Sequence, residues 1–321
     1  MTYDEIIALR ELISNVERAR ADTNALFDFE DEYLSAPEGI SVIVPVCNGA
    51  AEMDELLISL LNQSLDRKKF EVIFALNGCQ DDSRALVHHF AEVSGVDTRI
   101  LESDIANVAV ARNKALRHAR FQLTTFIDHD DHISRGYLQE CVKLGDYRSV
   151  VISNIIKVEG GKLVEDYAQK VVSQGFETSC VHSPDDIWLC YRAYTLNAIK
   201  TAPTYMLRRV KYDKNLSHSE DVKYWRDVFH AFTPITVKSP TRLDIYYRKV
   251  HAHSLSRRDT AFYSQAKPRF VILDSIRKEA ENYPCDAPQR KFDVQLEKLI
   301  LDTLVNLCSR PVNEQEPVKR A

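Results

Sequence analysis

ISVIVPVCNG, residues 40–49, is the stretch of the sequence that decides the fold. Its first seven residues are mostly apolar and β-branched, which is typical of a strand buried inside a sheet. Asn48 and Gly49 then favour a turn. After the turn, apolar residues between positions 53 and 61 recur at intervals of three and four, the period of one helix face. The stretch therefore predicts a buried strand, a turn and a helix in succession.

The same order of elements continues downstream. The pattern predicts strands at 70–76, 98–101 and 123–127, with helices at 82–93 and 108–119 between them. Strands that alternate with helices form a mostly parallel sheet covered by helices on both faces. Ligands bind such sheets beyond the carboxyl ends of the strands. The sequence thus predicts an α/β protein with its site at that edge of the sheet.

The second half of the chain is less regular. We expect strands at 150–158 and 245–250, with a hairpin turn at 159–162 after the first of them. Ser219 is expected to cap a helix that runs through Ala231. Residues 164–210 show no pattern that assigns their secondary structure.

Composition narrows the functional classes. The chain has 321 residues, 45% of them hydrophobic, and a net charge of -5 at pH 7, so no overall positive field attracts nucleic acid. No apolar run approaches the roughly eighteen residues that span a bilayer. The first twenty residues do not resemble a secretory signal. Seven cysteines without a CxxC pair favour free thiols in a reducing compartment. We therefore expect a cytoplasmic protein, with peripheral contact at the inner face of a membrane left open.

An acidic cluster, residues 128–131 with the sequence DHDD, directly follows the predicted strand 123–127. Three carboxylates within four residues repel one another unless a positive charge neutralises them. Mg²⁺ or Mn²⁺ bound to a diphosphate is a natural partner, because such ions take one or two carboxylates together with phosphate oxygens. An acidic loop that caps the next helix would look the same. The cluster alone leaves both interpretations open.

Six segments in order place the cluster in a wider context. They are 41–48 (SVIVPVCN), 77–83 (NGCQDDS), 111–116 (ARNKAL), 126–131 (FIDHDD), 218–225 (HSEDVKYW) and 246–256 (YYRKVHAHSLS). Together they resemble glycosyltransferase family 2 of the GT-A fold over residues 39–256. Two positions depart from the family pattern: Cys47 stands where a tyrosine is usual, and Leu76 or Asn77 stands where an acid often contacts the base.

The resemblance implies that residues 39–256 are the GT-A catalytic domain, and it implies a set of site residues. Residues 1–38 and 257–321 lie outside it, and the helical spacing of their apolar residues predicts a helical N-terminal extension and a helical C-terminal extension. Asp221 would be the catalytic base, with Glu220 beside it. The implied metal ligands are Asp130, Asp128 and His251, for Mn²⁺ or Mg²⁺. The residues implied to bind the nucleotide sugar are Pro45, Val46, Asn48, Asn77, Arg112, Asn113, Asp128, His129, Asp130 and Arg248.

The implied reaction moves a sugar, with inversion, from a nucleoside-diphosphate sugar to an acceptor hydroxyl. A UDP-sugar is the favoured donor, and the acceptor would be a carbohydrate or glycolipid in surface polysaccharide or glycoconjugate synthesis. An oligomer is possible. The sequence leaves the sugar, the base and the linkage open.

Other interpretations of the same residues remain. A strand that ends in Asp-x-Asp also begins haloacid-dehalogenase-like phosphohydrolases, although there it normally ends the first strand of the core. A GT-A module could bind nucleotide or carbohydrate without catalysis. Residue by residue, Arg112 could be a surface cation, Asn113 a cap, Glu220 and Asp221 a favourable helix start, and His251 an ordinary loop residue.

Overall fold

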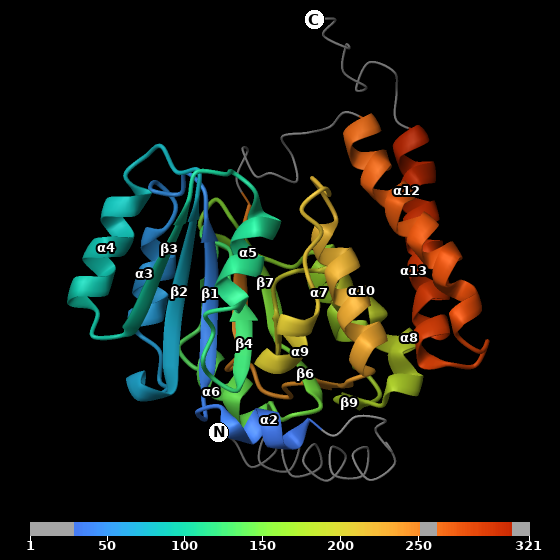
Figure 1. The fold of residues 1–321 in the computed structure, drawn as a ribbon, viewed down its shortest axis with the longest axis horizontal. Coiled ribbons are helices and arrows are strands. Elements are labelled where there is room, and N and C mark those ends of the chain that lie inside the picture. Colours follow the sequence, from blue (N-terminus) through green and yellow to red (C-terminus); the bar gives the residue numbers. More distant parts are fainter. Residues whose placement is uncertain (1–28, 251–261, 310–321) are drawn as a thin grey trace, which may run out of the picture.

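The computed structural model of the chain describes residues 29–250 and 262–309, and its centre is an eight-stranded sheet (Figure 1). The strand order is β3-β2-β1-β4-β10-β6-β11-β9. The four strands from β3 to β4 are parallel to one another. Their bounds are β1 (Ile40–Val46), β2 (Phe70–Asn77), β3 (Asp97–Ser103) and β4 (Leu123–Phe126). The predicted α/β fold with a mostly parallel sheet is confirmed in this half of the molecule.

Three helices connect these four strands. They are α3 (Asp54–Leu61), α4 (Ser83–Val93) and α5 (Val108–Leu116). The helices α3 and α4 lead the chain outward to β3, and α5 returns it across the sheet to β4, in front of β1 and β4 in Figure 1. Every residue of β1 and β2 is buried, as expected for strands covered on both faces. The carboxyl ends of β1, β2 and β4 therefore meet at one edge of the sheet.

The other half of the large sheet contains β6 (Ser149–Ile152), β9 (Val181–His182), β10 (Lys200–Pro203) and β11 (Ile235–Lys238). β10 runs antiparallel to both of its neighbours, β4 and β6. The single strand predicted at 150–158 is wrong, because the chain changes sheets at Ser153. The amide of Ser153 donates to Ile199 at 2.8 Å, whereas the next amide, that of Asn154, donates to Asp244 at 3.1 Å.

A second sheet of four strands lies beside the first. Its order is β5-β12-β7-β8, with bounds β5 (His132–Ile133), β7 (Asn154–Glu159), β8 (Lys162–Val164) and β12 (Ile245–Lys249). The predicted strand at 245–250 and the hairpin turn at 159–162 are confirmed. Gly160 and Gly161 both have positive φ, 57° and 75°, as the turn between β7 and β8 requires.

The remaining helices fill the second half of the chain. They are α2 (Glu30–Ser35), α6 (Tyr137–Leu144), α7 (Tyr167–Gln174), α8 (Ile187–Cys190), α9 (Thr204–Arg209) and α10 (Glu220–Phe232), with short 3₁₀ turns η1 (Arg67–Lys69), η2 (Pro184–Asp186), η3 (Tyr191–Thr195) and η4 (Ala280–Asn282). The expected side-chain cap by Ser219 is wrong. Ser219 precedes α10, but its φ is 60° and its side chain makes no capping hydrogen bond.

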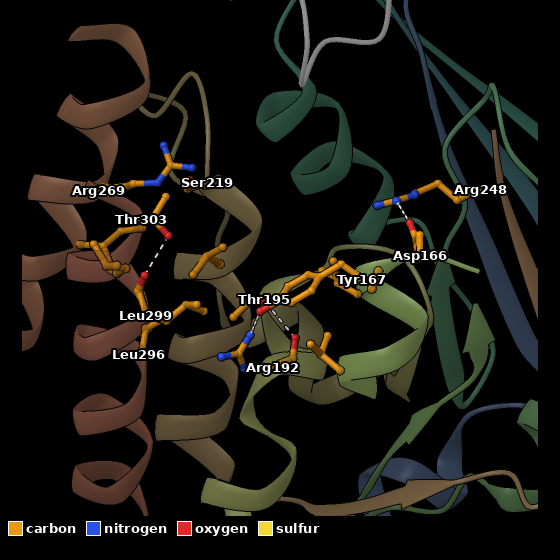
Figure 2. Close-up of a pocket in the computed structure, with 16 residues that line it drawn as sticks. Asp166, Tyr167, Arg192, Thr195, Ser219, Arg248, Arg269, Leu296, Leu299 and Thr303 are labelled. Carbon is orange, nitrogen blue, oxygen red and sulfur yellow. Dashed lines mark hydrogen bonds and ion pairs between the residues drawn. The ribbon is translucent and has the colours of Figure 1, made fainter. Parts of the chain in front are cut away.

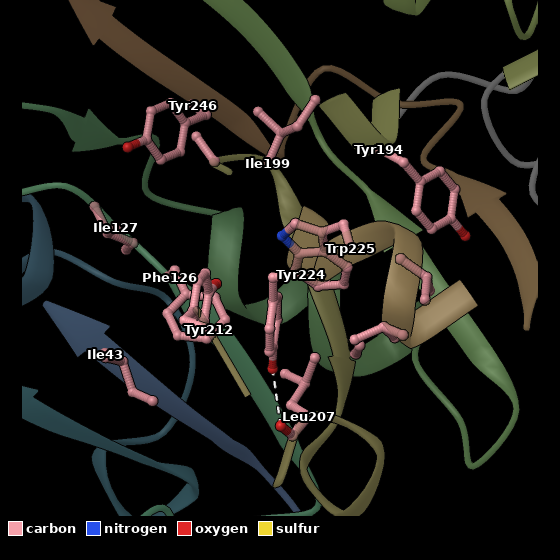
Figure 3. Packing of buried hydrophobic residues seen from close by; sticks show 14 of the residues in the cluster. Ile43, Phe126, Ile127, Tyr194, Ile199, Leu207, Tyr212, Tyr224, Trp225 and Tyr246 are labelled. Atoms are coloured by element: carbon pink, nitrogen blue, oxygen red, sulfur yellow. Dashed lines mark hydrogen bonds between the residues drawn. The ribbon is translucent and has the colours of Figure 1, made fainter. Parts of the chain in front are cut away.

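Aromatic side chains connect α10 to the sheet (Figure 3). The rings of Tyr212 and Tyr224 stack with centroids 3.7 Å apart, and Phe126 of β4 meets Tyr212 edge-on at 5.7 Å. The hydroxyl of Tyr224 donates to the carbonyl of Leu207 at 2.8 Å, so burial leaves that hydroxyl satisfied. This packing fixes the start of α10 relative to the end of β4.

Two C-terminal helices, α12 (Phe262–Glu279) and α13 (Pro288–Cys308), form an antiparallel pair against α8 and α10 (Figure 1). Leu296, Leu304 and Leu307 of α13 are buried. One apolar face of this helix therefore packs on the rest of the protein, whereas Val294, Leu301 and Val305 are exposed. Among the helices within 29–250 and 262–309, none combines the length and apolarity needed to cross a membrane.

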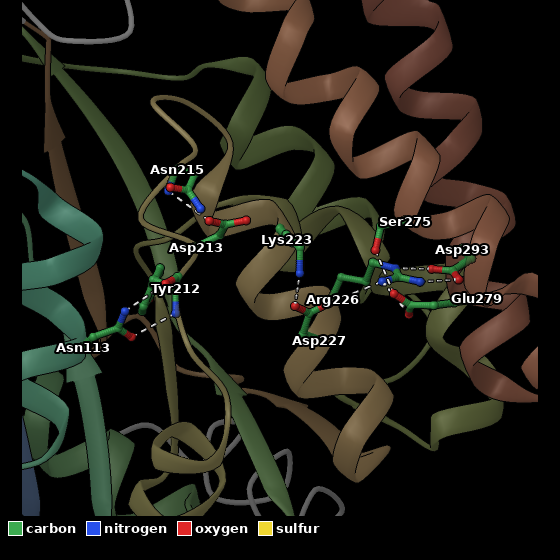
Figure 4. Close-up of polar contacts among 10 residues, drawn as sticks. All are labelled: Asn113, Tyr212, Asp213, Asn215, Lys223, Arg226, Asp227, Ser275, Glu279 and Asp293. Carbon is green, nitrogen blue, oxygen red and sulfur yellow. Dashed lines mark hydrogen bonds and ion pairs between the residues drawn. The ribbon is translucent and has the colours of Figure 1, made fainter.

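A buried ion pair also holds the C-terminal helices in place (Figure 4). Arg226 of α10 donates to both carboxylate oxygens of Asp293 on α13, at 2.7 and 2.8 Å, and both side chains are almost fully buried. His230 lies 3.0 Å from the same carboxylate. A bidentate pair of this kind fixes both the distance and the orientation of the two helices.

Candidate functional site

Two loops at the carboxyl edge of the sheet are tied together by hydrogen bonds. Asn48, after β1, accepts from the amide of Gln80 at 2.7 Å. In the same way, the amide of Gly49 donates to Ser83 at 2.9 Å. These bonds hold the loops after β1 and β2 as one unit. Asn48, predicted to bind nucleotide, is exposed at this edge with a positive φ of 50°.

Three other predicted nucleotide-binding residues are buried beneath the loops. Pro45 and Val46 lie inside β1, so a ligand could reach them only through the backbone. Asn77 is also buried, and its side-chain amide donates to the carbonyl of Val46 at 2.8 Å. Cys79 lies 3.3 Å from the same carbonyl. Asn77 therefore orients the end of β1 in this structure.

His129 lies against the loop after β1. A Cβ atom placed on Gly49 would come within 2.1 Å of Cδ2 of the His129 imidazole. Only glycine leaves room for the ring at this position. The imidazole consequently connects the first loop to the acidic segment that follows β4.

The carboxylates of the acidic segment, residues 128–131, lie in two different environments. Asp131 is buried, with 4% exposure, and accepts from the hydroxyl of Tyr246 and the amide of Lys249, both at 2.7 Å. Burial, followed by the nearby charges of Asp130 and Asp128, raises the pKa of Asp131 above its ordinary value. Asp131 thus anchors β12 beneath the site. Asp128 and Asp130 are only half-buried and remain at the strand end.

Arg112 of α5 lies between the acidic segment and the start of α10. It is 4% exposed and donates to Asp128 at 3.1 Å and to Glu220 at 2.9 Å. Its guanidinium also lies 5.3 Å from the centre of the Tyr212 ring. Burial opposes the charge, but the surrounding anions, Asp128 first, raise the pKa of Arg112 above its ordinary value. A surface role for Arg112 is excluded by these contacts.

Glu220 and Asp221 form the first turn of α10. Burial raises the pKa of both carboxyl groups, and for Glu220 the repulsion from Asp221 adds to it, while the charge of Arg112 opposes both shifts. Asp221 accepts a hydrogen bond from the amide of Val222 at 2.8 Å. Arg112 is paired with Glu220, not with Asp221, so the two adjacent acids have different surroundings.

Lys200 of β10 is a neighbour that the sequence analysis missed. Its side chain is fully buried, donates to the carbonyl of Ala193 at 3.0 Å and lies 4.7 Å from the Trp225 ring centre. Burial lowers the pKa of Lys200 well below its ordinary value, and the charge of Asp221 opposes that shift. A single lysine in the segment LNAIKTAP, 196–203, gives no pattern that marks it in advance.

Two of the predicted site residues, Asn113 and Arg248, have other positions. Asn113 forms a double hydrogen bond with the backbone of Tyr212, at 2.8 and 2.9 Å, which makes it a positioning residue in this structure. Arg248 pairs with Asp166 and lines a neighbouring cavity. His251 lies outside the described residues.

The carboxylates at the end of β4 are the candidate ligands for a metal ion. Within residues 29–250 and 262–309, no three His, Cys, Asp or Glu side chains converge to form a metal site. Mg²⁺ and Mn²⁺ do not require such a set, because they are bound through one or two carboxylates plus phosphate oxygens of the substrate. Asp128 and Asp130 offer two carboxylates of this kind. The donor set therefore fits a hard divalent ion that arrives with a diphosphate.

A cavity of about 320 Å³ lies next to the start of α10 (Figure 2). Ser219 and Val222, which flank Glu220 and Asp221, both line it. Its other walls come from α7, η3, β12 and the two C-terminal helices. No sequence pattern indicates this cavity, because its walls come from segments that are far apart in the chain.

Known proteins resemble this chain in sequence. It is 25% identical over 219 residues to poly(ribitol-phosphate) beta-N-acetylglucosaminyltransferase TarS of Staphylococcus aureus, a match that covers 68% of this chain and 35% of the relative. The putative glycosyltransferase EpsH of Bacillus subtilis is 25% identical over 227 residues, 68% of this chain and 63% of the relative. The chain thus spans about a third of the length of TarS.

Solved structures of other proteins have a fold similar to that of this chain. Residues 1–349 of S. aureus TarS in complex with UDP-GlcNAc superpose with a TM-score of 0.66 at 19% identity, covering 86% of this chain and 77% of the other. The mannosyltransferase PcManGT of Pyrobaculum calidifontis, in complex with GDP-Man and Mn²⁺, gives 0.59 at 17% identity, covering 97% and 88%. These matches confirm the predicted GT-A fold.

The sequence profile described as Glycosyl transferase family 2 matches residues 41–214, more than half of the chain. The matched range contains the loops after β1 and β2, Arg112 and the acidic segment after β4. The chain belongs to glycosyl transferase family 2.

Proposed function

We propose that this chain transfers a sugar from a nucleoside-diphosphate sugar to an acceptor hydroxyl, in the synthesis of a surface polysaccharide or related polymer. One observation carries the proposal: Arg112 joins the carboxylates at the end of β4 to the pair of acids at the start of α10. This contact supports a single site in which a diphosphate would bind and a proton would be removed. The family membership supports the same reaction class.

The donor would lie across the carboxyl edge of β1, β2 and β4. Asn48 and the loop backbone beside it would contact the base, and Asp128 and Asp130 would hold Mn²⁺ or Mg²⁺, whose charge neutralises the departing diphosphate. Arg112 would keep Asp128 oriented through its ion pair. A UDP-sugar is the donor that we propose.

Asp221 would accept the proton of the acceptor hydroxyl as that oxygen attacks the anomeric carbon. Glu220 is paired with Arg112, which leaves Asp221 as the better base. Its raised pKa makes it a stronger base than an exposed aspartate. A single base and one direct attack of the acceptor oxygen on the anomeric carbon suffice for the transfer. We therefore propose inversion at that carbon without a covalent enzyme intermediate.

A phosphohydrolase is not favoured, because the family match covers the very segments that would carry the motif. The proposal is tested by thermal unfolding of the full chain with UDP-GlcNAc, GDP-mannose and other nucleotide sugars, with and without Mn²⁺. A ligand that binds only the folded state raises the Tm. Slow release of nucleoside diphosphate from the same donor would show turnover. If no nucleotide sugar raises the Tm or is consumed, the proposal is wrong.

A further inference from the structure

Lys200 of β10 places a positive charge inside the protein, beside the start of α10. Its side chain is fully buried, donates to the carbonyl of Ala193 at 3.0 Å and lies 4.7 Å from the ring centre of Trp225. Both of these partners are uncharged. A lysine is rarely buried completely unless it is paired, because the transfer of a charge out of water is costly. The ammonium of Lys200 should therefore have an anion nearby.

The backbone holds Lys200 in this position under strain. Ile199, the preceding residue, is β-branched and has a φ of 71°, a conformation that such residues rarely adopt. The amide of Ser153 donates to the carbonyl of Ile199 at 2.8 Å, and the hydroxyl of Thr125 donates to the carbonyl of Lys200 at 3.1 Å. Strained residues persist where the surrounding structure fixes them, and they concentrate at functional sites. The start of β10, which carries Lys200, is thus fixed from two neighbouring segments.

Asp221 is the acid that acts on this ammonium. Asp221 and Trp225 are four residues apart on α10, so their side chains lie on the same face of the helix, one turn apart. The ring of Trp225, which Lys200 contacts, is fully buried (Figure 3). Burial lowers the pKa of Lys200, and the charge of Asp221 opposes that shift. Burial raises the pKa of Asp221, and the charges of Arg112 and Lys200 oppose it. Lys200 and Asp221 therefore stabilise each other's charge.

Other charged and titratable groups also face Asp221. They are Arg112 of α5, Asp128 after β4, Tyr212 before α10 and the adjacent Glu220. Arg112 is already bound to Asp128 and Glu220, so its positive charge is shared among three acids. Lys200, in contrast, has Asp221 as the acid that opposes its loss of a proton.

We propose that Lys200 is a positioning residue for the transfer: its buried ammonium is the counter-ion that keeps Asp221 ionised and able to accept the proton of the acceptor hydroxyl. The inference rests on the proposed function, in which Asp221 is the base. Asp221 is half-buried, whereas Lys200 is fully buried, so Lys200 acts through Asp221 without contact to a substrate. The hydroxyl proton passes to Asp221, and Lys200 keeps its own proton.

The first experiment compares pH–kcat profiles of the full chain at saturating donor and Mn²⁺. Release of nucleoside diphosphate is followed with the donors tested above, UDP-GlcNAc first. Lys200→Met removes the charge, and Lys200→Gln removes the charge but keeps a donor for the carbonyl of Ala193. Without the counter-ion, Asp221 takes up a proton at higher pH. On the acidic side of the profile, kcat of both variants should therefore be about tenfold below the wild type, and it should approach the wild-type value at high pH.

Lys238→Met is the matched control. Lys238 is a half-buried lysine of β11 in the same sheet, and its ammonium donates to Asn154 at 2.6 Å. This variant should keep the wild-type pH profile, and donor affinity should be unchanged in both Lys200 variants. A profile that stays in place in Lys200→Met and Lys200→Gln would overturn the inference. An equal loss of kcat at every pH would also overturn it, because that result indicates a structural role alone.

The second experiment needs no turnover, so it separates this inference from the proposed function. Urea unfolding at neutral pH compares Lys200→Met, Asp221→Asn and the double variant, with Lys200→Gln in place of Lys200→Met if the latter does not fold. The loss of stability in the double variant should be smaller than the sum of the two single losses, because the two charges compensate each other. Additive losses would overturn the inference and leave the transferase function standing. Non-additive losses in a chain that consumes no nucleotide sugar would confirm the contact and contradict the proposed function.

Discussion

Arg112 donates a hydrogen bond of 2.9 Å to Glu220, a residue 108 positions later in the chain. The same guanidinium reaches Asp128 at 3.1 Å. One buried cation thus faces an acid at the end of β4 and an acid at the start of α10. Removing its charge would leave those acids close together in a region of low solvent access, where like charges repel strongly.

Arg112→Gln should reduce the free energy of unfolding by about 3 kcal/mol, because breaking a buried ion pair leaves its partners uncompensated. Arg112→Lys should recover only part of this loss, since an ammonium group cannot form the two-sided contact of a guanidinium. Urea unfolding of the three proteins measures the effect. Arg84→Gln, an exposed control whose partner is Glu102, should be nearly neutral. Similar stability of Arg112→Gln and Arg84→Gln would contradict the central role of Arg112.

Asp130→Asn should abolish turnover and leave the Tm of the unliganded protein within a few degrees of the wild type. An amide oxygen is a weaker ligand for Mg²⁺ or Mn²⁺ than a carboxylate. Excess EDTA should have the same effect on the wild type, and added Mn²⁺ should reverse it. Activity is followed by release of nucleoside diphosphate. Full activity of the wild type in EDTA would show that the reaction needs no divalent ion.

Local patterns predicted the first half of the fold because its strands alternate with helices along the chain, and β1 and β2 are apolar, buried runs that each end in an Asn-Gly turn or just before one. The strand at 40–46 and the helix after it needed no knowledge of the rest of the chain. The same logic failed at Ser153, where β6 ends and β7 begins in another sheet. The sequences of β6 and β7 both favour a strand. The position of the bend between them depends on their partner strands, most of which are distant in sequence.

Side-chain partners were harder to predict than the location of the site. The sequence grouped Asp128, Arg112 and Glu220 through the family resemblance, and the structure places these three in contact. It could not predict that Asn113 would bind the backbone of Tyr212, or that Lys200 would be buried near Asp221. Such contacts depend on residues brought together only by the folded chain.

Asn77→Asp should destabilise the protein by about 1–3 kcal/mol, the usual cost when a buried partner is left without its donor. The Asn77 amide donates to the carbonyl of Val46, and a carboxylate there would face that carbonyl without a proton to share. If position 77 instead contacted the base, as the family resemblance implies, the new acid would sharpen nucleotide affinity. Urea unfolding and UDP titration on the same sample separate the two. A stable variant with tighter UDP binding would place position 77 in the pocket.

Asp293→Asn should loosen the C-terminal helices and reduce stability by about 3 kcal/mol at neutral pH. Burial raises the pKa of Asp293, but hydrogen bonds from Arg226 and His230 outweigh it and hold that pKa below its ordinary value of 3.8. A lowered pKa means that the stabilisation is present above 3.8 and is lost as the pH falls below it. The difference in unfolding free energy between wild type and variant should therefore shrink in acid. A difference that stays constant from pH 7 to pH 3 would argue against an ionised Asp293.

Asp221 and Glu220 are adjacent but make different contacts, and this difference predicts different kinetic effects. Glu220 accepts from Arg112, whereas Asp221 accepts from the amide of Val222 in its own helix turn. A general base contributes roughly 10²–10⁴-fold to the rate. Asp221→Asn should lower kcat by about that factor and leave donor affinity nearly unchanged, because the amide keeps the shape and cannot accept the proton.

Glu220→Gln is the matched control for Asp221→Asn, since it changes the neighbouring acid in the same way. It should weaken the contact with Arg112, lower stability and affect kcat less than Asp221→Asn does.

Burial raises the pKa of Asp221 above the ordinary 3.8 of an aspartate. The kcat of the wild type should therefore fall as the pH drops through that raised value, because protonated Asp221 cannot act as the base. Steady-state kinetics, donor titration and a pH–kcat profile on both variants test this. If Glu220→Gln is inactive while Asp221→Asn keeps near-normal kcat, Glu220 is the base and the bond to Arg112 must break during turnover. If both stay active, the first turn of α10 is structural and the base lies elsewhere.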